Sequence, residues 1–147
     1  MWTVEVVLMC ALNMLGRSPS SLPPIELVST LPANVSPGAE AYVRHNDPRI
    51  YLVTTTASFR DGRESKDRCG NAMATRKIAS VIIHEEVHLR QGADEKTAYQ
   101  AQLTMLMALG AGVGTVPYME VSRAMRHTLE QQRRNKPPAG LMASAQQ

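Results

Sequence analysis

The chain has few aromatic residues and few cysteines. Aromatic side chains make up 4% of its 147 residues, so the core must be built largely from Leu, Val, Ile, Met and Ala. The two cysteines, Cys10 and Cys69, form no C-x-x-C pair and do not suggest a disulfide framework, although a single bridge between them is compatible with the sequence. The cysteine count therefore sets no redox compartment.

A large excess of charge of one sign and a long apolar run are also missing. The net charge of +3 is too small to indicate nucleic-acid binding, and the basic residues do not alternate with aromatics. The apolar run of residues 2–15 is too short to span a membrane, and it lacks the basic start of a signal peptide. We therefore expect no nucleic-acid partner, no membrane association and a cytoplasmic location.

The length of the chain suits a single domain, and no internal repeat divides it. We expect that domain over residues 1–132 and a mobile tail over residues 133–147, where no apolar period continues. The pattern predicts an α+β fold, with a small antiparallel or mixed sheet of about three strands packed on one central helix. The expected elements are a helix at 2–15, a strand at 25–30, a hairpin formed by 41–45 and 49–53, a charged surface loop at 55–71, and helices at 72–91, at 95–109 and from Pro117 to about 132.

The strongest functional signal is the sequence His84-Glu85-Glu86-Val87-His88, an H-E-x-x-H motif near the end of the central helix. Residues four apart on a helix lie one turn above each other, so His84 and His88 can bind one metal ion. Glu85 can reach a water on that ion and accept its proton. The motif therefore predicts a zinc-dependent hydrolase with Glu85 as the general base.

A catalytic zinc site needs a third protein ligand, and the motif supplies only two. Glu95, Asp94 and the more distant His45 are candidates for this role. We favour Glu95, because Asp94 is expected to cap the helix that follows the motif. In addition, Glu95, Tyr99 and Gln102 form one polar strip on an otherwise apolar helix.

These residues resemble the zincin metallopeptidases, in particular the gluzincins, whose third zinc ligand is a glutamate on the helix after the H-E-x-x-H helix. The resemblance covers residues 72–110, and compact minigluzincin-type domains are closer in size than the larger members. It implies Zn²⁺ bound by His84, His88 and Glu95, and a peptide or protein substrate. It also implies that Glu85 passes its proton to the leaving amine.

Other features of the zincins also have candidate residues in this chain. The rival metzincin pattern would place the third ligand at Asp94, but it requires glycine at position 91, where this chain has Gln91. The resemblance implies a strand edge that pairs with the substrate backbone, for which we expect residues 51–54. An oxyanion donor is also expected, and the candidates are Tyr99, Tyr51 and Tyr42.

Two alternative functions remain compatible with the sequence. The chain could be a regulatory module that binds zinc or a peptide without cleaving it, although a purely structural site would more often use four protein ligands and would not need Glu85. The same ligands could also serve the hydrolysis of an amide in a small molecule, because ligand geometry does not name the substrate.

Overall fold

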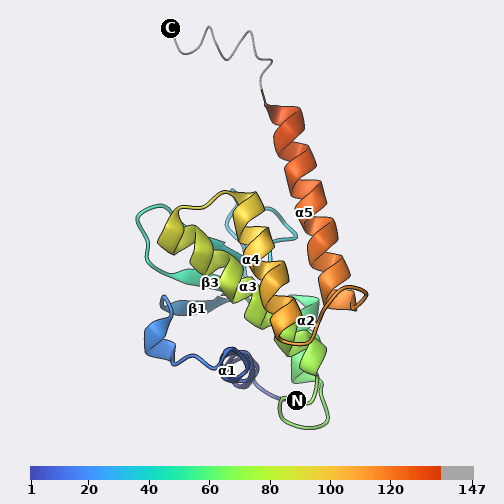
Figure 1. Cartoon of the computed structure of the whole chain (residues 1–147). Coiled ribbons are helices and arrows are strands. Elements are labelled where there is room, and N and C mark those ends of the chain that lie inside the picture. The colour runs from blue at the N-terminus through green and yellow to red at the C-terminus, as the bar shows by residue number, and fades with distance from the viewer. Residues whose placement is uncertain (137–147) are drawn as a thin grey trace, which may run out of the picture.

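The central element of the fold is α3 (Ala72–Gln91), the helix that carries the H-E-x-x-H motif (Figure 1). The structure is a computed structural model that describes residues 1–136. The other elements are α1 (Val4–Leu15), a 3-10 turn (Pro19–Ser21), β1 (Ile25–Val28), β2 (Ala41–Val43), β3 (Ile50–Val53), α2 (Ala57–Arg63), α4 (Glu95–Ala108) and α5 (Val116–Asn135). The predicted α+β class, with one helix before the sheet and a central helix packed on it, is confirmed.

The three strands form a mixed sheet in the order β1-β3-β2. β3 pairs in parallel with β1 and antiparallel with β2, so the predicted hairpin is confirmed. Successive side chains of a strand point to opposite faces of the sheet. Ile50 and Leu52 accordingly pack in the main core with α3, whereas Tyr51 and Val53 belong to a smaller cluster on the other face.

The expectation that residues 51–54 offer a free strand edge is wrong. β3 is the central strand, and its backbone groups pair with both neighbouring strands. Among the described strands, β2 contacts α3 and keeps one edge unpaired within the sheet. A strand edge beside the motif helix is therefore present, but it belongs to β2.

The main core is enclosed by α1, α2, α3 and the sheet. Ile78 and Ile82 of α3 are 2% and 0% exposed, and they pack with Val7 and Leu12 of α1 and with Leu52 of β3. The two isoleucines, four residues apart, lie on the side of the motif helix that faces the core. This packing fixes the helix on which the two histidines stand.

α2 replaces the first part of the charged surface loop that we expected over residues 55–71, so that expectation is wrong for residues 57–63, whereas residues 64–71 form neither helix nor strand. Thr56 caps the helix by accepting a hydrogen bond from the backbone N–H of Phe59, and the Phe59 ring is 1% exposed. Gly62 lies so close to α1 that an added Cβ would be 2.9 Å from a methyl carbon of Val7. Within α2 the buried residues are Ser58, Phe59 and Gly62, so the charged residues of the helix are left on its outer side.

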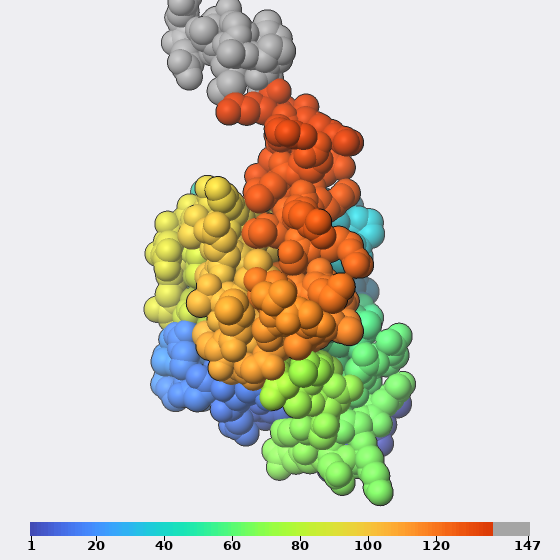
Figure 2. Space-filling model, turned by 45° about the vertical axis from the view of Figure 1, so that its right-hand side comes forward, coloured from blue at the N-terminus to red at the C-terminus, as the bar shows by residue number. Residues whose placement is uncertain are grey.

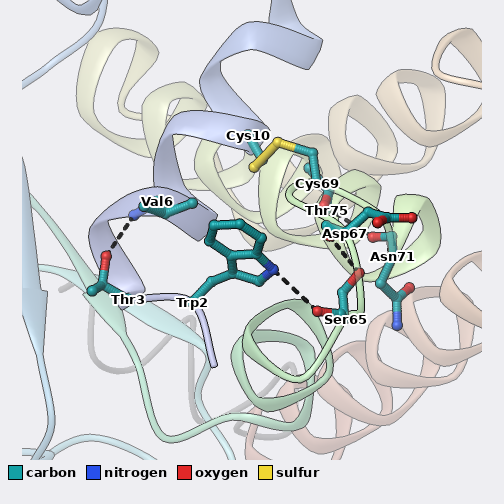
Figure 3. Close-up of a disulfide and its surroundings, with 9 residues drawn as sticks. All are labelled: Trp2, Thr3, Val6, Cys10, Ser65, Asp67, Cys69, Asn71 and Thr75. Carbon is teal, nitrogen blue, oxygen red and sulfur yellow. Dashed lines mark hydrogen bonds between the residues drawn. A yellow bond between two sulfur atoms is a disulfide. The ribbon is translucent and has the colours of Figure 1, made fainter.

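A disulfide between Cys10 and Cys69 joins α1 to the segment that leads into α3 (Figure 3). Trp2 supports the same junction, because its indole N–H donates to the carbonyl oxygen of Ser65 at 3.0 Å. The single bridge that the sequence allowed is thus present. A cytoplasmic location stays a prediction, and the disulfide weighs against it, because reducing compartments keep most thiols reduced. Over residues 1–136, no helix is both long and apolar enough to cross a bilayer.

α5 packs along α4, and its last turns extend beyond the rest of the described molecule (Figures 1 and 2). Pro117 lies in its first turn, as the sequence predicted. The helix continues through Asn135, so residues 133–135 are helical and not part of a tail. Glu130 forms ion pairs with Arg133 and Arg134 one turn later, which favours this extension. Residues 137–147 of the predicted tail lie outside the described residues.

Candidate metal centre

His84, His88 and Glu95 bring three ligand atoms together between α3 and α4. His84 Nε2 lies 3.5 Å from Glu95 Oε1, and His88 Nε2 is in direct contact with the same oxygen. The three ligand atoms lie within 4.8 Å of one another. In the part of the chain that the structure describes, this is the only cluster of three or more such side chains that could hold a metal ion.

A short turn between α3 and α4 brings the three candidate ligands together. Gly92 ends α3 in the left-handed conformation, with φ 57°, and its N–H donates to the carbonyl oxygen of His88 at 3.0 Å. Asp94 caps α4 by accepting a hydrogen bond from the backbone N–H of Thr97 at 2.8 Å. The predicted cap is confirmed, and it makes Glu95 the first residue of α4, where its side chain meets the two histidines.

The third candidate ligand, His45, lies elsewhere. It stands just after β2, in the turn that leads to β3, and it lines a depression beside His88 without joining the cluster. The structure thus separates the three candidates by position. Glu95 contacts both imidazoles, Asp94 caps α4, and His45 lines the depression.

The Nδ1 atom of each histidine forms a hydrogen bond with an oxygen acceptor. His84 Nδ1 lies 2.9 Å from Gln102 Oε1, and His88 Nδ1 lies 2.9 Å from the carbonyl oxygen of Ala93. A carbonyl oxygen can only accept, so each Nδ1 donates, and a neutral ring then keeps a lone pair on Nε2. The Nε2 atoms of both rings and the Glu95 carboxylate lie close together, and a cation could take the place of the protons that they share.

The charges of the cluster favour a cation as well. Hydrogen bonds from His84 and His88 lower the pKa of Glu95 to about 2, so its carboxylate is ionised at neutral pH. The same hydrogen bond with Glu95 raises the pKa of His88. Two imidazoles and one carboxylate are a donor set that suits Zn²⁺ and leaves a coordination position for a further ligand. The residues present therefore fit this metal.

Glu85 follows His84 on α3, and its side chain is largely withdrawn from solvent. The residue is 8% exposed, and burial raises the pKa of its carboxyl group, while the nearby His84 and His88 act in the opposite direction. A raised pKa brings the carboxyl group closer to the pH range in which a general base and acid exchanges protons.

One of the three candidate tyrosines lies at the cluster. The Tyr99 ring stands edge-on to the His84 ring, with centroids 4.5 Å apart, and its hydroxyl lies 3.3 Å from Thr128 Oγ1 on α5. Tyr42 and Tyr51 stack on each other on the sheet face that points away from α3, and the Tyr51 hydroxyl donates to Asp47. The structure therefore brings Tyr99 to the histidines and leaves the other two apart.

An open depression of about 840 Å³ adjoins the cluster at His88. The segment from Val43 to Pro48, which joins β2 to β3, forms one wall, and His88, Leu89 and Arg90 of α3 form another. The depression thus connects the end of β2 with the end of the motif helix. Its size falls in the range of ligand-binding pockets.

Glu86 has a structural role that the sequence did not reveal. Arg17 donates to both of its carboxylate oxygens at 2.6 and 2.7 Å, and Arg90 approaches it at 2.9 Å. Both arginines also donate to the carbonyl oxygen of Ser21. The hydrogen bond with Arg17 lowers the pKa of Glu86. This network ties the segment after α1 to the last turns of α3, next to His88.

The spacing of four between Glu86 and Arg90 was visible in the sequence, whereas the partner Arg17 is 69 positions away. Gln102 was noticed only as part of a polar strip, and its contact with His84 depends on how α3 and α4 pack. Comparison with known proteins adds no further residue, because no protein-family model, no curated protein and no solved structure matches this chain.

Proposed function

We propose that this chain is a zinc-dependent metallopeptidase with a zincin-like fold of the compact gluzincin type. The observation that supports this proposal best is the convergence of His84 Nε2, His88 Nε2 and Glu95 Oε1 within 4.8 Å, beside the buried Glu85. Zn²⁺ at this position would act as a Lewis acid that polarises a substrate carbonyl and makes water more acidic. Three protein ligands leave a position free, whereas structural zinc sites usually have four.

Glu85 performs the proton transfers in this proposal. It accepts a proton from the attacking water and then passes it to the amine that leaves. Its burial, which raises the pKa of the carboxyl group, favours the protonated form that the second transfer needs. Tyr99 is the candidate donor to the oxyanion, because its ring packs against His84.

A peptide suits the surroundings of the cluster. The free edge of β2 offers backbone donors and acceptors beside α3, and an extended peptide can pair with such an edge by β-augmentation. The open depression at His88 provides room for substrate side chains next to this edge. These features support a peptide or protein substrate more than a small amide, which would need a closed pocket.

The substitution Glu85→Gln tests hydrolysis separately from metal binding. We expect the variant to keep about one zinc per chain and to lose 10²- to 10⁴-fold in the cleavage rate of a mixed peptide library, because the proton acceptor is gone. Cleavage is followed by mass spectrometry. Glu64→Gln, a change at an exposed glutamate outside the cluster, is the matched control and should cleave normally.

Two results would contradict the proposal. Cleavage by Glu85→Gln as fast as by the unchanged protein would remove Glu85 from the chemistry. A zinc-loaded protein that binds some peptides of the library tightly and cleaves none of them would favour the non-catalytic binding module.

A further inference from the structure

We infer that the outer face of α5 is a docking site for an acidic segment of a partner protein, with Arg123 and Arg126 as its main contacts. Binding does not require a metal ion, and only its consequence for cleavage rests on the proposed function. The docking face is a shallow depression of about 390 Å³ on this helix, and it is lined by Arg123, Arg126, His127, Glu130, Gln131 and Arg134.

The positive charge of the chain is concentrated at this helix. Residues 121–136 contain four arginines, one lysine and a single carboxylate, that of Glu130. The rest of the chain contains eleven lysines and arginines and twelve aspartates and glutamates. The net charge of +3 therefore comes entirely from residues 121–136, and this part of the surface attracts anions.

The two arginines at the start of the docking face have no acidic partner within the described molecule. Glu130 forms ion pairs with Arg133 and Arg134, whereas Arg123 and Arg126 form none within residues 1–136. Both are exposed and lie one helical turn apart, so their guanidinium groups can bind one ligand together. Guanidinium groups match carboxylates in a bidentate geometry, which makes an acidic ligand the natural partner.

The docking face lies close to the candidate metal centre. Thr128 Oγ1, on the inner side of α5, is 3.3 Å from the Tyr99 hydroxyl, and the Tyr99 ring packs against His84. Only the width of α5 separates the docking face from Tyr99, and a helix with its side chains is about 10–12 Å across. The last turns of α5 stand clear of the rest of the described molecule, so a partner can reach them (Figures 1 and 2).

A membrane and a nucleic acid fit this face less well than an acidic peptide. A helix that lies on a membrane inserts large apolar side chains, and none of the exposed residues between Arg123 and Arg134 has one. A nucleic acid carries a phosphate at every nucleotide and would place some of them opposite Glu130. A peptide can place a neutral residue there instead.

The spacing of the arginines determines the probe. Arg126 and Arg134 are eight residues apart, which is about 12 Å along a helix, and an extended peptide covers this distance with three to four residues. The probe is therefore the peptide Gly-Glu-Glu-Gly-Ser-Glu-Glu-Gly, and its control has glutamine in place of each glutamate. Isothermal titration calorimetry at low salt should show binding of the acidic peptide only. The affinity should fall as sodium chloride is added, because salt screens exposed charges.

Two double variants with the same change in net charge locate the binding. We expect Arg123→Gln/Arg126→Gln to bind the acidic peptide at least about 10-fold more weakly than the unchanged protein. Arg60→Gln/Arg68→Gln changes two exposed arginines elsewhere and should weaken binding less than about 2-fold, because these charges are far from the docking face.

Three results would overturn the inference. The first is equal binding of the acidic peptide and its glutamine control, and the second is equal weakening by the two double variants, which would show an effect of net charge alone. The third is tighter binding of a DNA oligonucleotide or of phosphatidylserine vesicles than of the peptide, lost in Arg123→Gln/Arg126→Gln, which would replace the acidic segment as the partner.

If the proposed function holds, α5 recruits acidic substrates. A peptide that the protein cleaves is joined to the acidic probe through a flexible Gly/Ser linker, and we expect its KM to fall about 10-fold with little change in kcat. Arg123→Gln/Arg126→Gln should remove this difference, and equal KM values with and without the acidic probe would overturn this consequence. Absence of zinc-dependent cleavage in the unchanged protein would instead overturn the proposed function, and the calorimetry would still test the docking face.

Discussion

The neighbouring residues Asp94 and Glu95 have different roles because they occupy different positions at the start of α4. The N-cap residue directs its side chain back to the backbone N–H groups of the first turn, and Asp94 bonds that of Thr97. The next residue is the first of the helix and can direct its side chain outward, and Glu95 contacts His84 and His88. One residue of displacement therefore separates a structural carboxylate from a candidate metal ligand.

Asp47 gives a prediction about pH at the scale of a single residue. Its carboxylate accepts hydrogen bonds from the Tyr51 hydroxyl and from the backbone N–H of Arg49, and these bonds lower its pKa below 3.8. A carboxylate with a lowered pKa in the folded state stabilises the fold above its unfolded pKa. This contribution is lost as the pH falls through the folded pKa.

We therefore expect the unchanged protein to lose more stability than Asp47→Asn between about pH 6 and about pH 3. Urea unfolding at the two pH values measures the difference, and the other carboxylates cancel because both proteins contain them. Equal losses in the two proteins would show that the hydrogen bonds of Asp47 do not stabilise the fold.

The residues of the site differ in how far the sequence could predict them. His84, Glu85 and His88 were found from their spacing alone, and the choice between Glu95 and Asp94 followed from capping rules. Which of the three tyrosines lies at the site could not be predicted. Tyr51 lies on the face of β3 that points away from α3, and the sequence does not show which face of the sheet packs on that helix.

At the scale of elements, the short helix α2 is the clearest departure from the sequence prediction. Its seven residues are rich in charge, and no long apolar period marks it. The signal that was present is Thr56 followed by a buried aromatic residue in the first turn, a pattern too short to distinguish from a loop. α2 matters because it supports α1 and α3, on which the candidate site depends.

Phe59→Ala tests whether this element belongs to the core. The Phe59 side chain is 1% exposed, and removal of a buried phenylalanine ring costs about 3–5 kcal/mol of unfolding free energy. Met119→Ala is the control, because Met119 is 49% exposed and its loss should cost less than about 0.5 kcal/mol. Urea unfolding measures both. If Phe59→Ala lowered the unfolding free energy as little as the control does, the conclusion that α2 belongs to the core would be contradicted.

The order of the strands in the sheet also could not be predicted from the sequence. The hairpin of β2 and β3 could be predicted because its two strands are adjacent in the chain and are joined by turn residues. The pairing of β1 with β3 joins segments that are separated by β2, and local patterns carry no information about it. Whether β3 is an edge or a central strand depends on that pairing, so the substrate edge was assigned to the wrong strand.

At the scale of the whole molecule, the disulfide holds the N-terminal helix to the start of α3 across 59 residues of sequence. In the chain-entropy account, closing a loop of this length in the unfolded state contributes about 4 kcal/mol of stability. We expect reduction, or the double substitution of Cys10 and Cys69 by alanine, to lower the Tm by roughly 8–16 °C. Calorimetry with and without a dithiol reductant measures this shift, and a Tm that reductant leaves unchanged would contradict it.

The zinc content of the purified protein tests the central claim most directly. After reconstitution and removal of free metal, elemental analysis compares the unchanged protein with His88→Ala, Glu95→Ala and Asp94→Ala. The proposed centre predicts about one zinc per chain in the unchanged protein and in Asp94→Ala, and a loss in His88→Ala and Glu95→Ala. No zinc in the unchanged protein, or zinc lost with Asp94 and retained without Glu95, would contradict it.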